Sequence, residues 1–500
     1  MAPGILEILT LVGIAVLGIH YYLTSNFDFW KKRGVVGPQP QALFGNFKDI
    51  LFGKAHIALL VKKFYDAYPG EPMIGMFAPR GKPILILKDP DCIKDVLIKD
   101  FNVFSNRGLY VNKDKDPLNQ NLVNLEHERW RPLRNKLSPA FTSGKLREMF
   151  YLMTDCANHF ERYIVKNVVD RGTIECRELA AKFTTQSIGV CAFGLDTKSL
   201  DDENSEFRKC GRELFETNFA NVARRTLQEF VPKIYELLGP FKYSRAVLFF
   251  ARSTKETIDY RKKNGVRRND FVDILMDIQA QPDKLKNIDF DEKFLAGQAL
   301  VFFAAGFETS ATTISNTFYE LALNPDIQNK LRAEIQEEIK NNDGKLTYDG
   351  IKKMKYLDMV MKETLRKYPP GSVLVRKSGA SYTFSAKKVQ IPKDVTIMIP
   401  VWAIQRDPKI YPDPEKYDPE RFSEENEKSR HPMNYLPFGD GPHNCIGSRF
   451  ANYQTKIGII VVINKFKLEV CDKTCIPYIV EPRSLVPSPI GGIHLKLSKI

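Results

Sequence analysis

Apolar and polar residues follow one another along this chain in patterns that predict three prominent helices. Residues 4–23 are almost continuously apolar, and this run is about as long as a helix that crosses a bilayer. The longest predicted helix begins at Asp289, as its N-cap, and ends at Asn324, because Pro325 follows. Its middle is apolar on nearly every face, so we expect it to be buried all round. Apolar residues at helical spacing predict a third helix after Cys445.

The rest of the pattern predicts a mainly helical body with a small β region. Short β-like runs occur at residues 82–88, at 395–401 and near the C-terminus. The Gly- and Pro-rich stretch at 34–40 cannot continue a helix, and no internal repeat or later linker divides the chain. The predicted organisation is a membrane anchor at residues 1–25, a basic and Pro/Gly-rich linker at 26–40, and one large domain at 41–500.

The apolar run at the N-terminus is interpreted as a retained membrane anchor. A cleaved signal peptide is the alternative, but no basic residue precedes the run and no A-x-A-like cleavage site follows it. Lys31, Lys32 and Arg33 come after the run, which predicts that the body stays on the cytosolic side. Aromatic residues suited to a membrane interface precede these basic residues, namely Tyr21, Tyr22, Phe27, Phe29 and Trp30.

The net charge of +14 restricts the kind of partner. Lys and Arg residues are scattered along the whole chain without zinc-finger spacing, a basic tail or an RNA-binding aromatic motif, so no nucleic acid partner is expected. An anionic membrane surface or an acidic protein remains. The 8 cysteines are mostly far apart and no N-x-S/T glycosylation acceptor occurs, both as expected of a cytosolic domain.

One cysteine, Cys445, lies in the glycine-rich segment FGDGPHNCIG at residues 438–447. The helix predicted after it would stabilise a thiolate through its dipole and its free N–H groups. The glycines let the backbone approach a bulky flat ligand closely. A buried, inert thiol is the alternative, and zinc fits poorly because only His443 accompanies the cysteine. The segment is therefore a candidate for thiolate ligation of a metal.

FGDGPHNCIG resembles the haem-binding sequence F-x-x-G-x-x-x-C-x-G of the cytochromes P-450. WRPLR, AGFETS, KETLRKYPP and PERF resemble further motifs of that family and follow its order along the chain. The resemblance implies the cytochrome P-450 fold, which is mainly α with a small β region, preceded here by a single transmembrane helix. It also implies haem b (Fe-protoporphyrin IX), with Cys445 as the axial ligand of the iron. In style the motifs are most similar to those of insect family 6 enzymes, which commonly oxidise plant toxins and insecticides.

The resemblance also implies which residues surround the haem. His443 is a departure from the family, which commonly has an arginine there to contact a propionate. A histidine can still donate a hydrogen bond, but it is charged only when protonated, with a reference pKa of about 6.5, so we expect a weaker, pH-sensitive contact. The other residues implied to bind the cofactor are Phe438, Gly439 and Gly447 in the loop, and Trp130, Arg134, Arg376 and Arg107 at the propionates.

AGFETS, at residues 305–310, resembles the oxygen-activation motif A-G-x-E/D-T-T/S. The resemblance implies that Thr309 relays protons through water to the reacting oxygen and that Glu308 helps to deliver them. A carboxylate is costly in so apolar a helix, which favours a functional Glu308. The alternatives are a Thr309 hydroxyl bonded back to the preceding turn and a packing role for Gly306. Both can hold in part, because a local kink would open a groove for dioxygen.

KETLRKYPP resembles the family's E-x-x-R helix motif, with Glu363 and Arg366 on one helix face. The spacing alone is weak evidence, because Glu126/Arg129 and Glu427/Arg430 share it. The position before YPP and ahead of PERF implies a buried ion pair that Arg421 joins, with a structural role in bracing the haem loop.

The activity implied is monooxygenation, in which one oxygen atom of O2 enters a lipophilic small molecule and the other leaves as water. No G-x-G-x-x-G dinucleotide fingerprint occurs, so the electrons of NADPH must come through a separate protein. Similar membrane-anchored enzymes use NADPH–cytochrome P-450 reductase, with cytochrome b5 as a further expected partner, at the endoplasmic reticulum membrane. The basic residues predicted to meet the acidic reductase are Arg129, Arg131, Lys136, Lys428, Arg430 and Arg449.

The substrate is not readable from the sequence, but apolar residues near the oxygen-activation motif are candidates to line its pocket. Equivalent residues would also simply pack a core. Two other functions remain as alternatives. A haem-thiolate isomerase would need no reductase, and a non-catalytic haem carrier or sensor would need no proton-relay pair in a buried helix. The pocket residues predicted are Phe302, Phe303, Ala304, Val373 and Leu374.

Overall fold

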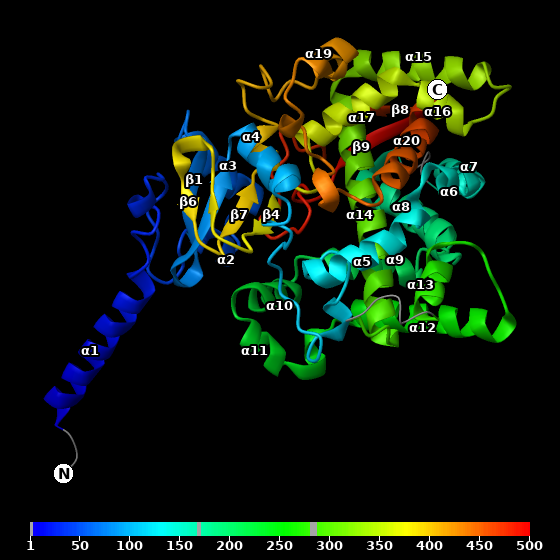
Figure 1. The fold of residues 1–500 in the computed structure, drawn as a ribbon. Helices are drawn as coiled ribbons and strands as arrows, with labels where there is room; N and C mark the ends of the chain where they lie inside the picture. Colours follow the sequence, from blue (N-terminus) through cyan, green and yellow to red (C-terminus); the bar gives the residue numbers. More distant parts are fainter. Residues whose placement is uncertain (1–3, 168–171, 281–287) are drawn as a thin grey trace.

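The computed structural model describes residues 4–167, 172–280 and 288–500 (Figure 1). At the N-terminus, α1 (Ile5–Thr24) extends away from the body, and none of its residues is buried. Two helices of the described chain are long and apolar enough to cross a membrane, α1 and α14 (Glu292–Leu323). Most of the apolar window of α14 is buried inside the protein, so only α1 leaves its apolar surface uncovered.

The long helix α14 runs through the middle of the helical part of the body (Figure 1). Asp291 caps it by accepting a hydrogen bond from the Phe294 amide, two residues after the predicted cap at Asp289, and it ends before Pro325 as predicted. Most of its residues are buried, in agreement with its apolar sequence. The helices packed against it include α8 (Cys176–Phe193), α12 (Arg245–Asn264), α17 (Lys355–Lys367) and α20 (Ser448–Lys465).

Shorter helices complete the mainly helical body. Those near the N-terminal side are α2 (Lys48–Leu51), α3 (Ile57–Ala67), α4 (Pro90–Lys94), α5 (His127–Leu137), α6 (Ser143–Glu148) and α7 (Phe150–Asn167). The others are α9 (Glu206–Phe215), α10 (Phe219–Phe230), α11 (Pro232–Leu237), α13 (Phe271–Gln279), α15 (Pro325–Lys340), α16 (Tyr348–Lys353), α18 (Val401–Ile404) and α19 (Glu424–Lys428).

The small β region is confirmed, and its largest sheet lies to one side of the helices (Figure 1). Its order is β1 (Met73–Ala78), β2 (Lys82–Leu87), β7 (Thr396–Ile399) and β4 (Leu374–Lys377). β2 and β7 are the strands predicted at 82–88 and 395–401, and they pair in parallel. The strand predicted near the C-terminus is β9 (His494–Lys499), which lies between β3 (Thr173–Glu175) and β8 (Phe466–Glu469). A two-stranded sheet joins β5 (Tyr382–Thr383) to β6 (Gln390–Ile391).

Within residues 26–40, the stretch predicted to be a basic and Pro/Gly-rich linker, Trp30 packs against the largest sheet. Trp30 is only 3% exposed, and its indole N–H donates to the Met76 carbonyl at 3.0 Å. The ring covers Gly75 so closely that a Cβ there would lie 2.3 Å from Trp30. Trp30 is therefore a core residue of the sheet rather than a membrane-interface aromatic, because the pocket over a glycine buries its large apolar surface.

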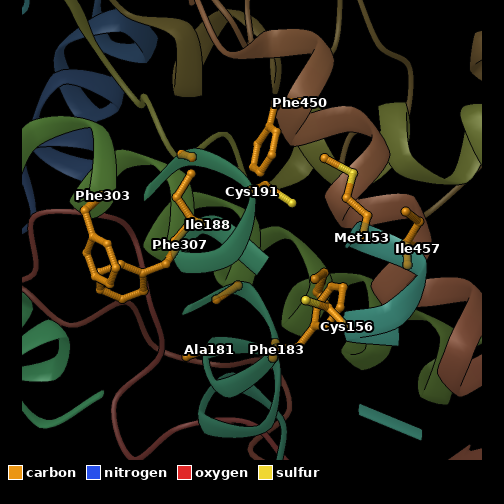
Figure 2. Close-up of a cluster of buried hydrophobic side chains, with 14 of the residues drawn as sticks. Met153, Cys156, Ala181, Phe183, Ile188, Cys191, Phe303, Phe307, Phe450 and Ile457 are labelled. Carbon is orange, nitrogen blue, oxygen red and sulfur yellow. The ribbon is translucent and has the colours of Figure 1, made fainter. Parts of the chain in front are cut away.

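The core around α14 joins helices that are far apart in the sequence (Figure 2). Met153 on α7, Ile188 on α8 and Phe450 on α20 belong to one buried cluster, together with Phe307 on α14. Gly306 is essential to this packing, because a Cβ there would lie 2.7 Å from Ile188 Cδ1. The packing role considered for Gly306 thus holds.

Candidate functional site

A cavity of about 340 Å³ lies between α14 and the segment that leads into α20. Its walls are mostly apolar and come from α5, α8, α14, α17, β4 and α20. The α14 residues that line it are Val301, Phe302, Ala305, Gly306, Thr309, Ser310 and Thr313. On the other side the lining residues include Phe438, Gly439, His443, Asn444, Cys445, Ile446 and Gly447. The cavity therefore brings the cysteine segment and the AGFETS segment together.

The cysteine loop, residues 438–447, presents Cys445 to this cavity. The Cys445 amide donates to the Phe438 carbonyl at 2.9 Å, which closes the loop, and α20 begins three residues later at Ser448. Gly439 has φ +66°, which favours glycine, and a Cβ on Gly447 would project into open space. Burial raises the pKa of the Cys445 thiol, while the Gly447 amide and the Arg134 guanidinium lower it. A cation bound at the sulfur would complete the stabilisation of a thiolate.

Three arginines at the cavity lack a carboxylate partner. Among the described residues Arg107, Arg134 and Arg376 form no ion pair, and their hydrogen bonds go to neutral groups such as the Val123 and Asn444 carbonyls. Arg376 Nε is buried without any partner. Burial lowers the pKa of Arg107 to about 9, helped by the charges of Arg376 and Arg134, and lowers the pKa of Arg376 to about 10. Three cations without counter-charges around one cavity, of which Arg376 is only 3% exposed, fit a ligand with two carboxylates, such as the propionates of haem.

His443 has a different partner from the one predicted. Its Nε2 atom donates to the Ser105 carbonyl at 2.7 Å, and its ring lies 3.8 Å from the Trp130 ring, centroid to centroid. Burial, with the charges of the cavity arginines, lowers the pKa of His443 to about 2. The ring is therefore neutral, and since Nε2 carries the hydrogen, Nδ1 has none to donate to a carboxylate. A pH-sensitive hydrogen bond from His443 to a propionate does not fit this geometry, whereas Trp130 Nε1 is a buried donor without a partner.

Thr309 and Glu308 lie on different sides of α14. Thr309 lines the cavity, and its hydroxyl donates back to the Ala305 carbonyl at 2.7 Å, as one of the alternatives had it. α14 is continuous across this segment, without the kink considered from the sequence. Glu308 is 3% exposed, is not part of the cavity wall, and forms an ion pair with Arg177 at the beginning of α8. No sequence signal identified Arg177, because the two residues are 131 positions apart.

The predicted pocket residues divide into two groups. Phe302 and Leu374 line the cavity, and Phe141, which the sequence did not single out, stacks on Phe302 with ring centroids 5.4 Å apart. Phe303, Ala304 and Val373 are not part of the cavity wall. Phe303 instead packs against Phe250 with ring centroids 4.5 Å apart, and Val373 packs beside the largest sheet. Phe303 thus lies on the face of α14 that packs against α12, whereas Phe302 faces the cavity.

Glu363 and Arg366 form a fully buried ion pair on α17, with both side chains 0% exposed. Arg366 donates to Glu363 at 2.6 and 2.8 Å and also to the Gln405 and Pro414 carbonyls. Arg421 approaches Glu363 at 3.7 Å. The rival pairs differ: Glu126–Arg129 is a surface pair with Glu126 54% exposed, and Glu427 pairs with Lys362 instead.

The predicted docking residues are not equivalent. Arg131, Lys136 and Arg449 are exposed and make no ion pair among the described residues. By contrast Arg129 pairs with Glu126, Lys428 pairs with Glu424, and Arg430 lies over the Tyr411 ring. Arg449 also lines a surface groove with two exposed lysines that the sequence analysis did not single out, Lys352 and Lys355.

Comparisons with known proteins agree with the geometry of the site. The model of the family described as "Cytochrome P450" matches residues 35–497. The chain is 40% identical to probable cytochrome P450 6a14 of Drosophila melanogaster, covering 98% of this chain and 99% of the relative. It is 39% identical to cytochrome P450 6A1 of Musca domestica, over 96% and 95% of the two chains. It is 37% identical to cytochrome P450 6B1 of Papilio polyxenes, over 98% and 99%.

Such identity over nearly the whole length carries the haem cofactor and the oxidoreductase class with it. The residues found around the cavity fit that cofactor, since a thiol, three unpaired arginines and an apolar wall meet there. The chain therefore belongs to the cytochrome P450 family, as a haem-dependent monooxygenase similar to the family 6 proteins of insects.

Proposed function

We propose that Cys445 is the axial ligand of the haem iron in a membrane-anchored monooxygenase that oxidises lipophilic xenobiotics. One observation carries the proposal: Cys445 and Thr309 line the same cavity, at which three arginines have no counter-charge among the described residues. When bound, the haem supplies the chemistry that inserts one atom of O2 into the substrate. All other tasks fall to the residues of this chain.

The cavity arginines orient the cofactor. Arg107, Arg134 and Arg376 are positioned to bind the two propionates, and Trp130 Nε1 is free to donate to them. Asn444, next to Cys445, accepts two hydrogen bonds from Arg134 at 2.9 Å, which links the propionate side to the cysteine loop. His443 fixes the same loop to Ser105 from the other direction. The loop is thereby held in place by its neighbours, and Gly447 leaves room for the porphyrin.

Proton delivery is assigned to Thr309 and Glu308. The Thr309 hydroxyl holds a proton at the cavity wall, at present donated to the Ala305 carbonyl, and can turn toward the cavity. Glu308 is linked to Arg177, whose side chain is 29% exposed, so the pair connects the buried helix to the solvent side. A proton taken up at this side reaches Thr309 through Glu308 and water.

The substrate is proposed to be a lipophilic small molecule, because apolar side chains dominate the cavity wall around Phe302, Phe141 and Leu374. These side chains exclude water and offer no charged group of their own to a substrate. Similarity to insect family 6 proteins supports xenobiotics, such as plant toxins or insecticides, as the substrate class.

Electrons are proposed to come from NADPH through NADPH–cytochrome P-450 reductase, with cytochrome b5 as a second donor. The exposed, unpaired Arg131, Lys136 and Arg449 support docking of an acidic partner on the cysteine-loop side. The exposed apolar helix α1 supports anchoring in the endoplasmic reticulum membrane with the body in the cytosol.

The test has two stages. The carbon-monoxide difference spectrum of the reduced protein should be of the thiolate type, and Cys445→His should abolish that type. With reductase and NADPH, a panel of lipophilic substrates should then give oxygenated products and substrate-stimulated NADPH consumption. An imidazole-type spectrum in the wild type would remove Cys445 as the ligand. A thiolate spectrum without NADPH consumption on any substrate would favour a haem carrier, and peroxide rearrangement without reductase would favour an isomerase.

A further inference from the structure

Gln454 lies in α20, nine residues after Cys445, and contacts α14. Its side chain is 0% exposed, and Nε2 donates to the Gly306 carbonyl of α14 at 2.8 Å. Among the described residues this is the one hydrogen bond between α14 and α20. The helix that follows the cysteine is therefore linked by a single polar contact to the first glycine of the oxygen-activation segment.

The acceptor of this bond is unusual. In an α-helix the carbonyl of Gly306 already accepts from the amide of Ser310, four residues later. The Gln454 side chain adds a second donor to this carbonyl, while α14 stays helical across the segment. The neighbouring Ala305 carbonyl likewise receives a second donor, from the Thr309 hydroxyl. The Ala305 and Gly306 carbonyls thus each accept a hydrogen bond from a side chain, in addition to the backbone bonds of the helix.

Gly306 is packed between two other helices, α8 and α20. α8 closes one side, because Ile188 Cδ1 would lie 2.7 Å from a Cβ at Gly306. α20 closes another through Gln454, while Phe450 of α20 packs in the same cluster as Ile188 (Figure 2). Elsewhere α14 and α20 meet through apolar groups, as where Ile314 approaches Gly458.

Polar atoms without partners remain beside this contact. Gln454 Oε1 and Ser310 Oγ are both buried and unpaired among the described residues, and Ser310 lines the cavity. Burying an unpaired polar atom is costly, so a position that needed packing alone would hold an apolar side chain. The amide at 454 is therefore explained by the bond that its nitrogen donates.

We propose that Gln454 is a positioning residue that fixes the turn Ala305–Thr309 relative to the cysteine-bearing side of the haem site. The proposal rests on the proposed monooxygenase function, because it assigns the use of this turn to proton delivery. Gln454 is not part of the cavity wall; it acts through the Gly306 carbonyl, by holding the turn that carries Thr309 in place against α20. Its effect is expected on how well electron use is coupled to product, rather than on haem binding.

The test compares two buried glutamines. Gln454→Met removes the donor at nearly constant volume, and Gln328→Met is the matched control. Gln328 is 2% exposed and donates to the Leu321 carbonyl, also on α14 but far along the helix from Thr309. It also donates to the Leu468 carbonyl and accepts from the Leu468 amide and from Arg332, so its replacement is the more severe test of stability. Both variants should retain haem. Gln454→Met should lower product formed per NADPH consumed by about fivefold, the factor that corresponds to one hydrogen bond of typical net strength, while Gln328→Met should not.

A second measurement and a second variant separate positioning from general stability. The C–O stretching frequency of the reduced carbon-monoxide complex senses polar groups on the α14 side, so it should shift in Gln454→Met and stay unchanged in Gln328→Met. Gln454→Glu should behave like the wild type, because a fully buried carboxyl facing a carbonyl stays protonated and can still donate.

The outcomes are distinguishable from failure of the proposed function. A wild type without a thiolate-type spectrum or NADPH-driven product would overturn the proposed function itself. Two results with an active wild type would overturn the positioning role. One is that Gln454→Met forms as much product per NADPH consumed as Gln328→Met. The other is that the C–O stretching frequency of Gln454→Met equals that of the wild type. Loss of haem from Gln454→Met but not from Gln328→Met would also overturn it, because the residue would then be structural.

Discussion

Two glutamate–arginine pairs, each with a buried glutamate, lie in different regions of this protein, and they are held very differently. Glu363–Arg366 on α17 is 0% exposed at both side chains. Each partner is tied further: Glu363 accepts from the Asp418 amide, and Arg366 donates to three backbone carbonyls. Any movement of this pair would leave several polar groups unpaired, so it acts as a fixed brace.

Glu308–Arg177 joins α14 to α8 beside the oxygen-activation segment and has little support. Among the described residues Arg177 is the one side-chain partner of Glu308, and the arginine side chain is 29% exposed. Water can take over the solvation of Arg177 when the pair separates, which is not possible for Arg366. The chemistry of a pair therefore does not decide its role: the number of its fixed neighbours does.

The largest effect is expected from breaking the brace. Glu363→Gln leaves the Arg366 charge buried and uncompensated, which costs about 3–5 kcal/mol. We expect little folded, haem-containing protein, measured by haem content per chain and by thermal unfolding. Glu126→Gln is the control, since Glu126 pairs with Arg129 at the same spacing but is 54% exposed. A Glu363→Gln protein that folds and binds haem normally would show that the Glu363–Arg366 pair is not needed to hold the fold.

Glu308→Gln should separate function from folding. An amide keeps the shape of the side chain but cannot release a proton, and loss of a positioned acid or base lowers rates by about 100-fold or more. We expect haem content near that of the wild type, with product formation reduced by at least about tenfold and NADPH consumption diverted to hydrogen peroxide. Loss of haem in this variant would instead place Glu308 with the structural pair.

Arg177→Gln should have a smaller effect, because water can partly replace the guanidinium at a position that is 29% exposed. We expect a two- to fivefold loss in product per NADPH with unchanged haem content, in line with about 0.5–1 kcal/mol for a partly exposed pair. Arg212→Gln provides the control, since Arg212 pairs with Glu178 on the same helix α8 but is 54% exposed. If the two variants form the same amount of product per NADPH consumed, Arg177 does not act on Glu308.

The smallest effect should come from exposed basic residues at the surface. Reversing the charges of Arg131, Lys136 and Arg449 together should slow reductase-driven turnover by about twofold at low salt and spare peroxide-driven turnover. Lys428→Glu is the control, because Lys428 already pairs with Glu424. Measuring both activities against ionic strength checks the assignment. An equal loss in the two assays would show that the substitutions damaged the site instead of the docking.

Patterns within a few residues predicted much of this structure. Apolar spacing and a capping aspartate identified α14 to within three residues of its beginning, and the β-like runs identified β2 and β7. Glu363 and Arg366 were identified as a buried pair from their motif, although Glu126/Arg129 and Glu427/Arg430 share the spacing. These features follow from local backbone geometry and from short motifs, which the chain specifies without reference to distant segments.

Contacts between distant segments depended on the tertiary structure. The partner of Glu308 lies on α8, His443 reaches Ser105, and Gln454 reaches Gly306, each across more than a hundred residues. Sequence spacing carries no information on such pairs, because their geometry is set by how the helices pack. By itself the sequence determined the elements, the cysteine segment and the family resemblance. Packing alone decided which polar groups are braced by many neighbours and which are left free to move.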